Sequence, residues 1–126
     1  MVDLTLSRLP GEFAVHRLAP DAAIPDNVWR GPFVSVARSA EELSIVTDAG
    51  IHVDAQHTEA PWLAYRVAGA LDFSMTGVMS ALTSPLAAAG IGILAIGTFD
   101  TDYILVRADS GEAAEITWRA AGIGIA

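Results

Sequence analysis

Apolar and polar residues alternate along several short segments of the chain, and this period of two predicts β-strands. Turns rich in proline, glycine and aspartate separate the segments. The predicted strands are residues 2–9, 13–18, 33–38, 43–47, 62–68, 92–99, 102–107 and 123–125. Because Leu9-Pro10-Gly11-Glu12 is a turn sequence, we expect the first two strands to form a hairpin. Residues 48–61 are polar and end in a proline, which predicts a linker.

A helical period replaces the alternation at residues 77–89, where apolar side chains recur at spacings of three and four. Thr76 is its expected N-cap, and Gly90 its expected terminating glycine. Pro85 stands inside the segment, where a proline costs about 3 kcal/mol or kinks the helix.

A second helix is predicted at residues 110–121, ended by Gly122. The sequence Ala-Ala-Gly-Ile-Gly-Ile occurs at 88–93 and again at 120–125, each time where a helix should end and a strand begin. The second half of the chain therefore has the order β-α-β-β-α-β, which is the ferredoxin-like pattern.

The first half resembles the second. Residues 33–49 align without a gap on residues 93–109, and residues 13–18 match 62–67. This similarity favours two related modules whose clefts meet at a seam, the first having lost most of its first helix. The predicted modules are residues 1–60 and residues 61–126. Alternatively, any two strand-turn-strand segments look alike.

Composition narrows the classes of function. The formal net charge is −8, and the scattered basic residues are all arginine, so nucleic-acid binding is not expected. Cysteine is absent, which excludes disulfides and thiolate chemistry. The chain shows no signal peptide and no run of about 20 apolar residues, so we expect a cytoplasmic protein without membrane partners.

The sequence gives little support for a catalytic or metal-binding motif. No G-x-S-x-G occurs, and no carboxylate pair is marked for acid–base work. His52, Asp54 and His57 form an H-x-D-x-x-H cluster, whose side chains suit a metal, but the segment is typical of a solvated polar loop. We therefore expect no enzyme activity, no cofactor and no metal.

Two segments of the second half resemble small bacterial ACT-domain proteins and, over the same stretch, the arginine sensors of the CASTOR group. These are residues 71–77, which precede a helix, and residues 98–106. Residues 9–15 and 39–46 are similar to the leading segments of that family. The resemblance implies an α+β fold of tandem ferredoxin-like ACT modules, with antiparallel sheets and helices on one face. It also implies effector sites where modules meet, frequent dimers, and amino-acid sensing rather than chemistry.

The resemblance further implies a ligand site at the start of the first helix and at the following strand-turn-strand. The implied ligand-binding residues are Asp72, Phe73, Ser74, Met75, Thr76, Gly77, Thr98, Phe99, Asp100 and Asp102. Physically, amides at the start of a helix can hold a carboxylate, and Asp100 or Asp102 can pair with an ammonium. Alternatively, Thr76 only caps the helix and the two aspartates form an ordinary turn.

The sequence thus predicts a regulatory protein that binds a small molecule, expected to be an amino acid, at the seam between ACT modules, and that acts as a homodimer without catalysis. The alternative is a module that binds no ligand and assembles with other proteins through sheet edges.

Overall fold

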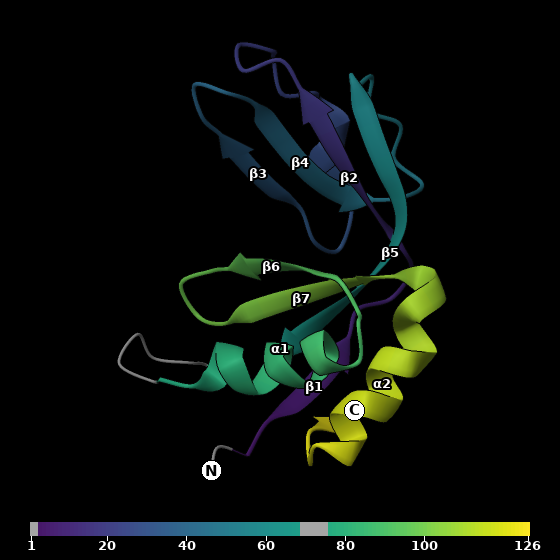
Figure 1. Cartoon of the computed structure of the whole chain (residues 1–126). Helices are drawn as coiled ribbons and strands as arrows, with labels where there is room; N and C mark the ends of the chain where they lie inside the picture. Colours follow the sequence, from purple (N-terminus) through teal and green to yellow (C-terminus); the bar gives the residue numbers. More distant parts are fainter. Residues whose placement is uncertain (1–2, 69–75) are drawn as a thin grey trace. The chain divides into compact units, whose positions relative to one another are not determined.

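A computed structural model describes residues 3–68 and 76–126 and divides the chain into two units. The first, here called the α/β unit, comprises Met1–Leu9 and Leu63–Ala126. The second, here called the β unit, comprises Pro10–Trp62. The long strand β5 (His57–Val67) runs from the β unit into the α/β unit, so it contributes to both (Figure 1).

The α/β unit confirms the predicted order of strands and helices in the second half. After β5 come α1 (Val78–Ala88), β6 (Ile93–Gly97), β7 (Asp102–Arg107), the 3-10 turn η2 (Ala108–Ser110), α2 (Gly111–Ala120) and β8 (Gly124–Ile125). The strand order is β6-β7-β5-β1-β8, where β1 is Thr5–Arg8. This mixed, mostly antiparallel sheet with two helices is a ferredoxin-like, ACT-type fold.

The predicted N-terminal hairpin is wrong. β1 pairs antiparallel with β5 and parallel with β8, and not with the strand that follows it. Leu6 lies opposite Val67, and the amide of Ala126 donates to the carbonyl of Leu6 over 2.8 Å. Leu6 is fully buried, so β1 completes the core of the α/β unit. Burial of this apolar strand in the α/β unit outweighs the local preference of the Pro10-Gly11 turn.

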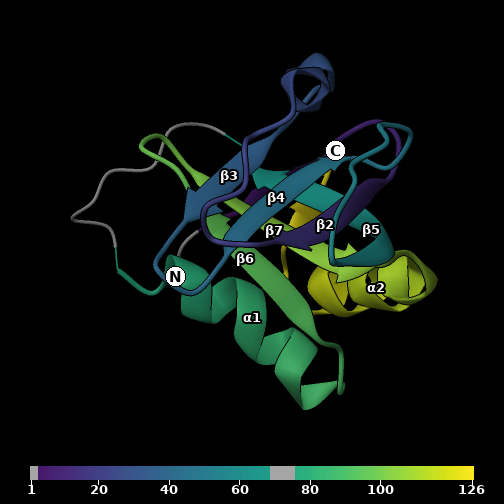
Figure 2. The ribbon, with the colours of Figure 1, turned by 90° about the horizontal axis from the view of Figure 1, so that it is seen from above.

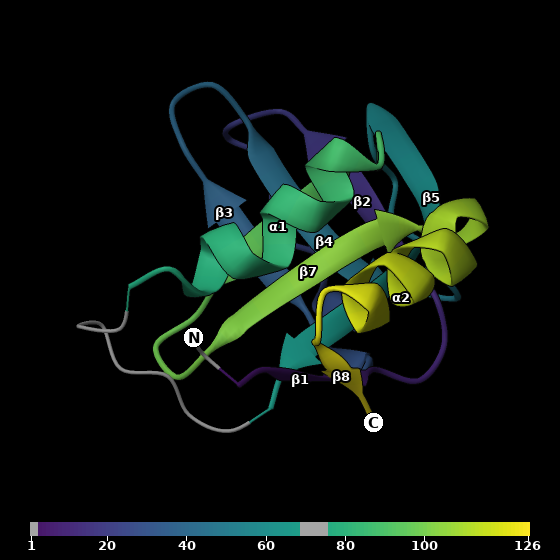
Figure 3. The ribbon, with the colours of Figure 1, turned by 60° about the horizontal axis from the view of Figure 1, so that its bottom comes forward.

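Both helices cover one face of the sheet of the α/β unit (Figure 3). Leu82 and Leu86 of α1 and Trp118 of α2 are fully buried against Tyr65 and Ile104 of the strands. The indole Nε1 of Trp118 donates to the carbonyl of Leu82 over 2.8 Å, which ties the two helices together. Tyr65 and Trp118 are thus core residues of the α/β unit.

The repeated Ala-Ala-Gly-Ile-Gly-Ile segments end both helices, as predicted. Gly90 and Gly122 have φ of 75° and 86°, a left-handed conformation that glycine adopts without strain. The amides of Ile91 and Ile123 then donate bonds of 2.9 Å to carbonyls five residues earlier.

The start of α1 differs from the prediction that Thr76 is its N-cap. Gly77 occupies the N-cap position with φ of 80°, and no side chain of the described residues makes a capping hydrogen bond there. Pro85 lies within α1, and the helix continues past it to Ala88.

The β unit has the strand order β3-β4-β2-β5, and Figure 2 shows β3, β4 and β2 side by side. Its elements are β2 (Phe13–Leu18), the 3-10 helix η1 (Asp26–Arg30), β3 (Ser35–Arg38), β4 (Leu43–Asp48) and the first part of β5. Leu18, Val28, Leu43, Ile45 and Val53 form its core. The predicted linker at 48–61 is wrong at its end, because β5 begins at His57.

The strands of the two units follow the same order. In the β unit the central first strand β2 has the third strand β4 beside it, and the second strand β3 lies at the edge. In the α/β unit β5, β7 and β6 take these places. The two hairpin turns also agree, because the amides of Ser39 and Thr98 each donate to a carbonyl three residues later over 2.9 Å.

Candidate functional site

The N-terminus of α1 is the first part of the candidate site. Its first intrahelical bond runs from the amide of Ala81 to the carbonyl of Gly77 over 2.9 Å, so the amides of Val78, Met79 and Ser80 precede the helical ladder. The first turn has no acidic residue. A Cβ atom built at Gly77 would meet nothing within 4 Å among the described residues, so there is open space beside this residue. Such a helix start attracts a carboxylate.

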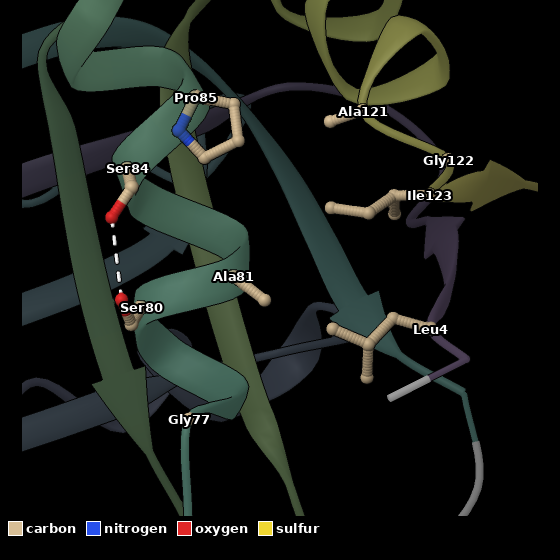
Figure 4. A pocket seen from close by; sticks show the side chains of 9 residues that line it. All are labelled: Leu4, Gly77, Ser80, Ala81, Ser84, Pro85, Ala121, Gly122 and Ile123. Atoms are coloured by element: carbon tan, nitrogen blue, oxygen red, sulfur yellow. Dashed lines mark hydrogen bonds between the residues drawn. The ribbon is translucent and has the colours of Figure 1, made fainter. Parts of the chain in front are cut away.

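A groove of about 460 Å³ adjoins this helix start. Ala81 and Pro85 of α1 face Leu4 and Ile123 across it (Figure 4). The full lining is Leu4, Gly77, Ser80, Ala81, Ser84, Pro85, Ala121, Gly122 and Ile123. The groove is therefore uncharged and mostly apolar, and it has the size of a small-molecule pocket.

Two serines of α1 belong to the lining of this groove and bond to each other. The Ser80 and Ser84 hydroxyls lie 3.3 Å apart, one helical turn from each other (Figure 4). The groove thus has Gly77 and the start of α1 at one end, and it continues as a mostly apolar channel along α1.

The hairpin between β6 and β7 is the second part of the predicted site. The Thr98 hydroxyl donates to the carbonyl of Thr101 over 3.0 Å and accepts from the amide of Thr101 at 3.3 Å. The buried Thr101 hydroxyl donates in turn to the carbonyl of Val67 over 2.9 Å. The turn is therefore built by its threonines, and Thr101 is a structural residue that the sequence reasoning missed.

Phe99, Asp100 and Asp102 take different positions in this hairpin. The Phe99 side chain is 80% exposed at the tip of the turn, Asp100 is exposed beside it, and Asp102 is half-buried at the start of β7. The start of α1 and the turn between β6 and β7 lie at the same end of the α/β unit (Figures 1 and 3).

The remaining predicted positions precede α1. Asp72, Phe73, Ser74 and Met75 lie outside the described residues. Thr76 is exposed at the start of α1. The ligand-binding role of the predicted residues therefore stays a prediction.

A polar cluster in the core of the α/β unit has a structural role. The Tyr65 hydroxyl donates to Glu115 over 2.5 Å, and burial followed by this bond raises the pKa of Tyr65 far above its usual value. Arg8 and Arg119 lie 3.8 and 3.5 Å from the Glu115 carboxylate. Because Tyr65 is protonated and the Glu115 carboxylate has cationic partners, this cluster links β5 to α2.

His16 is the buried titratable side chain of the β unit. Its Nδ1 lies 2.9 Å from the Thr58 hydroxyl, and its Nε2 lies 2.9 Å from the Thr47 hydroxyl. Burial, and secondarily the charge of His52, lowers its pKa. A pocket of about 380 Å³ lies beside it, lined by His16, His52 and Thr58 among others. His16 is thus a buried histidine of β2 whose two ring nitrogens both have hydrogen-bond partners.

The H-x-D-x-x-H segment does not gather around a metal position. Within residues 3–68 and 76–126, no three histidine or acidic side chains are placed to hold an ion. His57 instead lies 3.6 Å from Glu59 within β5.

Neither helix of the described ranges is long and apolar enough to cross a membrane.

Comparison with known families gives two matches along the chain. A family described as the ACT domain matches residues 57–117, which cover β5 through most of α2. A second family, defined as the N-terminal domain of a group of similar proteins, matches residues 11–50. No curated protein matches the sequence.

Solved structures resemble the chain over most of its length. A protein from Agobacterium tumefaciens is 34% identical with a TM-score of 0.91, and the match covers 100% of this chain and 94% of that one. A Vibrio cholerae protein of unknown function, titled a possible transport protein, is 15% identical with a TM-score of 0.72, covering 95% and 91%. The regulatory subunit of aspartate kinase from Thermus thermophilus is 11% identical with a TM-score of 0.60, covering 88% and 93%. The last two likenesses concern the fold alone.

Proposed function

Because residues 57–117 match the ACT-domain family and the fold is of the ferredoxin-like type, we propose that the chain is a regulatory ACT-domain protein that binds an amino acid and catalyses no reaction. The proposed site is the start of α1 together with the groove along that helix and the Thr98–Asp102 hairpin. That the ligand lies at a seam between two modules stays a prediction, as does the cytoplasmic location.

The observation that carries this proposal is the start of α1 at one end of a mostly apolar groove, with Gly77 at the N-cap position and no capping side chain among the described residues. In this proposal the amides of Val78, Met79 and Ser80 bind the α-carboxylate, whose negative charge the helix dipole favours. Asp100 or Asp102 is the proposed partner of the α-ammonium.

The lining of the groove also suggests which class of side chain the bound amino acid has. None of its lining residues is charged, and Leu4, Ala81, Pro85 and Ile123 form its walls. A charged ligand side chain would lose water there without gaining a partner, at a cost of at least a few kcal/mol. We therefore propose an amino acid with an apolar side chain.

The proposal includes a tandem origin of the two units. The shared strand order supports it, and so does the shared hydroxyl turn, in which Ser39 and Thr98 occupy the same place. In the β unit, η1 follows the first strand where α1 follows it in the α/β unit. A degenerate N-terminal module and a C-terminal ACT module, divided near residue 60, remain the proposed organisation.

Thermal-shift measurements with each of the twenty amino acids test the proposal. A ligand present at about 100 times its dissociation constant adds about 2.7 kcal/mol to the free energy of unfolding, which raises the melting temperature by several degrees. We expect a shift with apolar amino acids, and none with their decarboxylated amines. No shift with any amino acid at millimolar concentration would contradict amino-acid binding.

A matched pair of variants separates binding from folding. Ser80→Glu places a carboxylate in the first turn of α1, where it stabilises the helix but repels a ligand carboxylate. Ser84→Glu places the same charge one turn later. We expect Ser80→Glu to raise the melting temperature of the ligand-free protein while weakening binding, and to weaken it more than Ser84→Glu does.

The second candidate function is a protein-interaction module that binds no ligand. The edge strand β6 favours it, because β6 pairs only with β7 among the described strands and its sequence Ile-Leu-Ala-Ile-Gly carries no charge. Purification of the native protein in a stable complex whose assembly ignores amino acids would favour this candidate.

A further inference from the structure

The pocket of about 380 Å³ beside His16 belongs to the β unit, whereas the groove along α1 belongs to the α/β unit. It lies between the face of β2 and β5 that carries His16 and Thr58 and the loop that follows β4. We propose that this pocket is a second binding site, which takes a small carboxylate beside the side chains of His52 and Thr58. The inference does not depend on the proposed function, because no residue lines both cavities.

The pocket exists because a loop, and not a helix, covers His16. In the α/β unit, α2 lies over Tyr65, whose ring centre is 5.0 Å from that of Trp118. His16 takes the place of Tyr65 when residues 13–18 are matched with residues 62–67. Within the described residues, however, no helix lies between β4 and β5. A loop fills less space than a helix that carries a tryptophan, so a pocket remains beside the imidazole.

Backbone hydrogen bonds hold the loop that forms one wall of the pocket. The amide of Gly50 donates to Oδ1 of Asp48 over 2.8 Å, and the amide of Ile51 donates to the carbonyl of Asp48 over 3.1 Å. The side-chain amide of Asn27 donates to the carbonyl of His52 over 2.8 Å. The His52 side chain itself is exposed. Because the wall is already fixed, a ligand can bind without the cost of ordering it.

The charges around the pocket favour an anion. Two of the three histidines of the chain, His16 and His52, line it, and none of the lining residues is acidic although the net charge of the chain is −8. Arg17 of β2, and His57 and Glu59 of β5, alternate with His16 and Thr58, so they take the other face of the sheet. The other charged side chains of the neighbouring elements lie outside the lining, and they are Asp26, Arg30, Asp48 and Asp54. Protonation of the two imidazoles therefore makes the pocket positive.

Protonation of His16 also prepares Thr58 to bind a carboxylate. The imidazolium donates through both ring nitrogens, so the Thr58 hydroxyl, 2.9 Å from Nδ1, must then accept. The hydrogen of that hydroxyl becomes available to a ligand in the pocket. Burial and, secondarily, the charge of His52 lower the pKa of His16, and a carboxylate held nearby raises it again. Carboxylate binding is therefore coupled to proton uptake.

The remaining lining favours a carboxylate with a short aliphatic chain. It consists of a glycine and small or branched apolar residues: Ala14, Ala49, Gly50, Ile51, Val53 and Ala60. A strongly hydrated inorganic ion would lose water against these walls without gaining partners. The volume lies near the lower end of small-molecule pockets, which suits a ligand of a few carbon atoms. Butyrate is therefore the probe.

An NMR titration of the whole chain with butyrate tests the site. At about pH 6, where histidines are partly protonated, we expect saturable shifts of the amides of residues 50–53 and a raised pKa of His16. Binding should be roughly tenfold weaker at about pH 7.5, because it takes up a proton. Sodium chloride at the same ionic strength controls for screening, and sodium phosphate tests the preference for a carboxylate.

Three variants assign the contacts. Thr58→Val keeps the shape of an exposed strand residue and removes its hydroxyl, and His52→Gln removes the ionisable ring. We expect each to weaken butyrate binding roughly tenfold, the usual effect of losing a hydrogen bond to a charged group. His57→Gln is the matched control, because His57 is exposed and outside the lining, and it should leave binding unchanged.

Saturable butyrate shifts at residues 50–53 that weaken in Thr58→Val and His52→Gln, but not in His57→Gln, would support the site. Equal shifts with chloride, saturation by phosphate but not by butyrate, or equal weakening in His57→Gln and His52→Gln would overturn it. Ser80→Glu separates this inference from the proposed function, since it should weaken amino-acid binding at α1 and leave the butyrate shifts of residues 50–53 unchanged. Butyrate shifts confined to the amides of α1 would overturn the second site alone.

Discussion

Replacing Gly77 by alanine should destabilise the protein through the backbone alone. Gly77 has φ of 80°, and a Cβ there would meet no atom within 4 Å among the described residues. The cost is therefore that of a left-handed residue with a side chain, about 1–2 kcal/mol. Alanine also lowers the entropy of the unfolded chain, which offsets about 0.4–1 kcal/mol. We expect a net loss of about 1 kcal/mol.

Urea denaturation followed by circular dichroism measures this loss, which also corresponds to roughly 3–6 °C in melting temperature. Gly92→Ala is the matched control, because a Cβ at Gly92 also meets nothing within 4 Å and its φ is not left-handed. Gly77→Asn should lie between glycine and alanine, since asparagine tolerates this conformation. Equal midpoints for Gly77→Ala and Gly92→Ala would refute the reasoning.

Two further variants probe the core of the α/β unit, and the pH dependence of stability probes the buried histidine of the β unit. Trp118→Phe removes the bond to the Leu82 carbonyl and leaves a cavity, which should cost about 2 kcal/mol in urea denaturation; an unchanged midpoint would count against the buried indole bond. Thr101→Val removes the donor to the Val67 carbonyl and should cost about 1 kcal/mol, whereas a neutral effect would mean that this bond contributes nothing. His16 has a lowered pKa in the folded state, so the unfolded chain binds more protons, and stability should fall as the pH drops below the ordinary histidine value of 6.5. An NMR titration that places the pKa of His16 above 6.5 would reverse this prediction.

Local signals in the sequence predicted the elements that local chemistry determines. Both helices end at a glycine that precedes an isoleucine, because Gly90 and Gly122 supply the left-handed residue that closes a helix. The strands 13–18 and 102–107 have the predicted bounds, since alternation and flanking turns mark both of their ends.

Long-range pairing could not be predicted in the same way. The turn at Pro10-Gly11 favoured a hairpin locally, but the partners of β1 are β5 and β8, more than fifty residues away in sequence. The polar segment at the start of β5 looked like a linker because its side chains are exposed, although its backbone pairs with β2.

The comparison of the two halves needs a shift of one residue. The gapless alignment places Leu43 on Tyr103, whereas the shared turn places Ser39 on Thr98 and hence Leu43 on Asp102. With this shift, the three consecutive buried residues of β4 (45–47) align with the three consecutive buried residues of β7 (104–106). A shift of one residue moves every side chain of a strand to the other face of the sheet. The correct alignment of the two halves could therefore be established only from the backbone pairing in the structure.

The candidate site was predicted only in part. Gly77 is one end of the groove, and the motif around it drew attention to the start of α1. The opposite wall comes from Leu4 and Ile123, residues that no local pattern joins to α1. Only the fold, which brings β1 and β8 together, builds that wall.

The most direct test of the central claim is an NMR titration of the ¹⁵N-labelled protein with apolar amino acids. We expect saturable shifts of the amides of Val78, Met79 and Ser80, together with residues of the Thr98–Asp102 hairpin. The corresponding amines, which lack the carboxylate, should leave the three α1 amides unmoved. Amides of α1 that do not shift with any amino acid at millimolar concentration would contradict the proposed binding site.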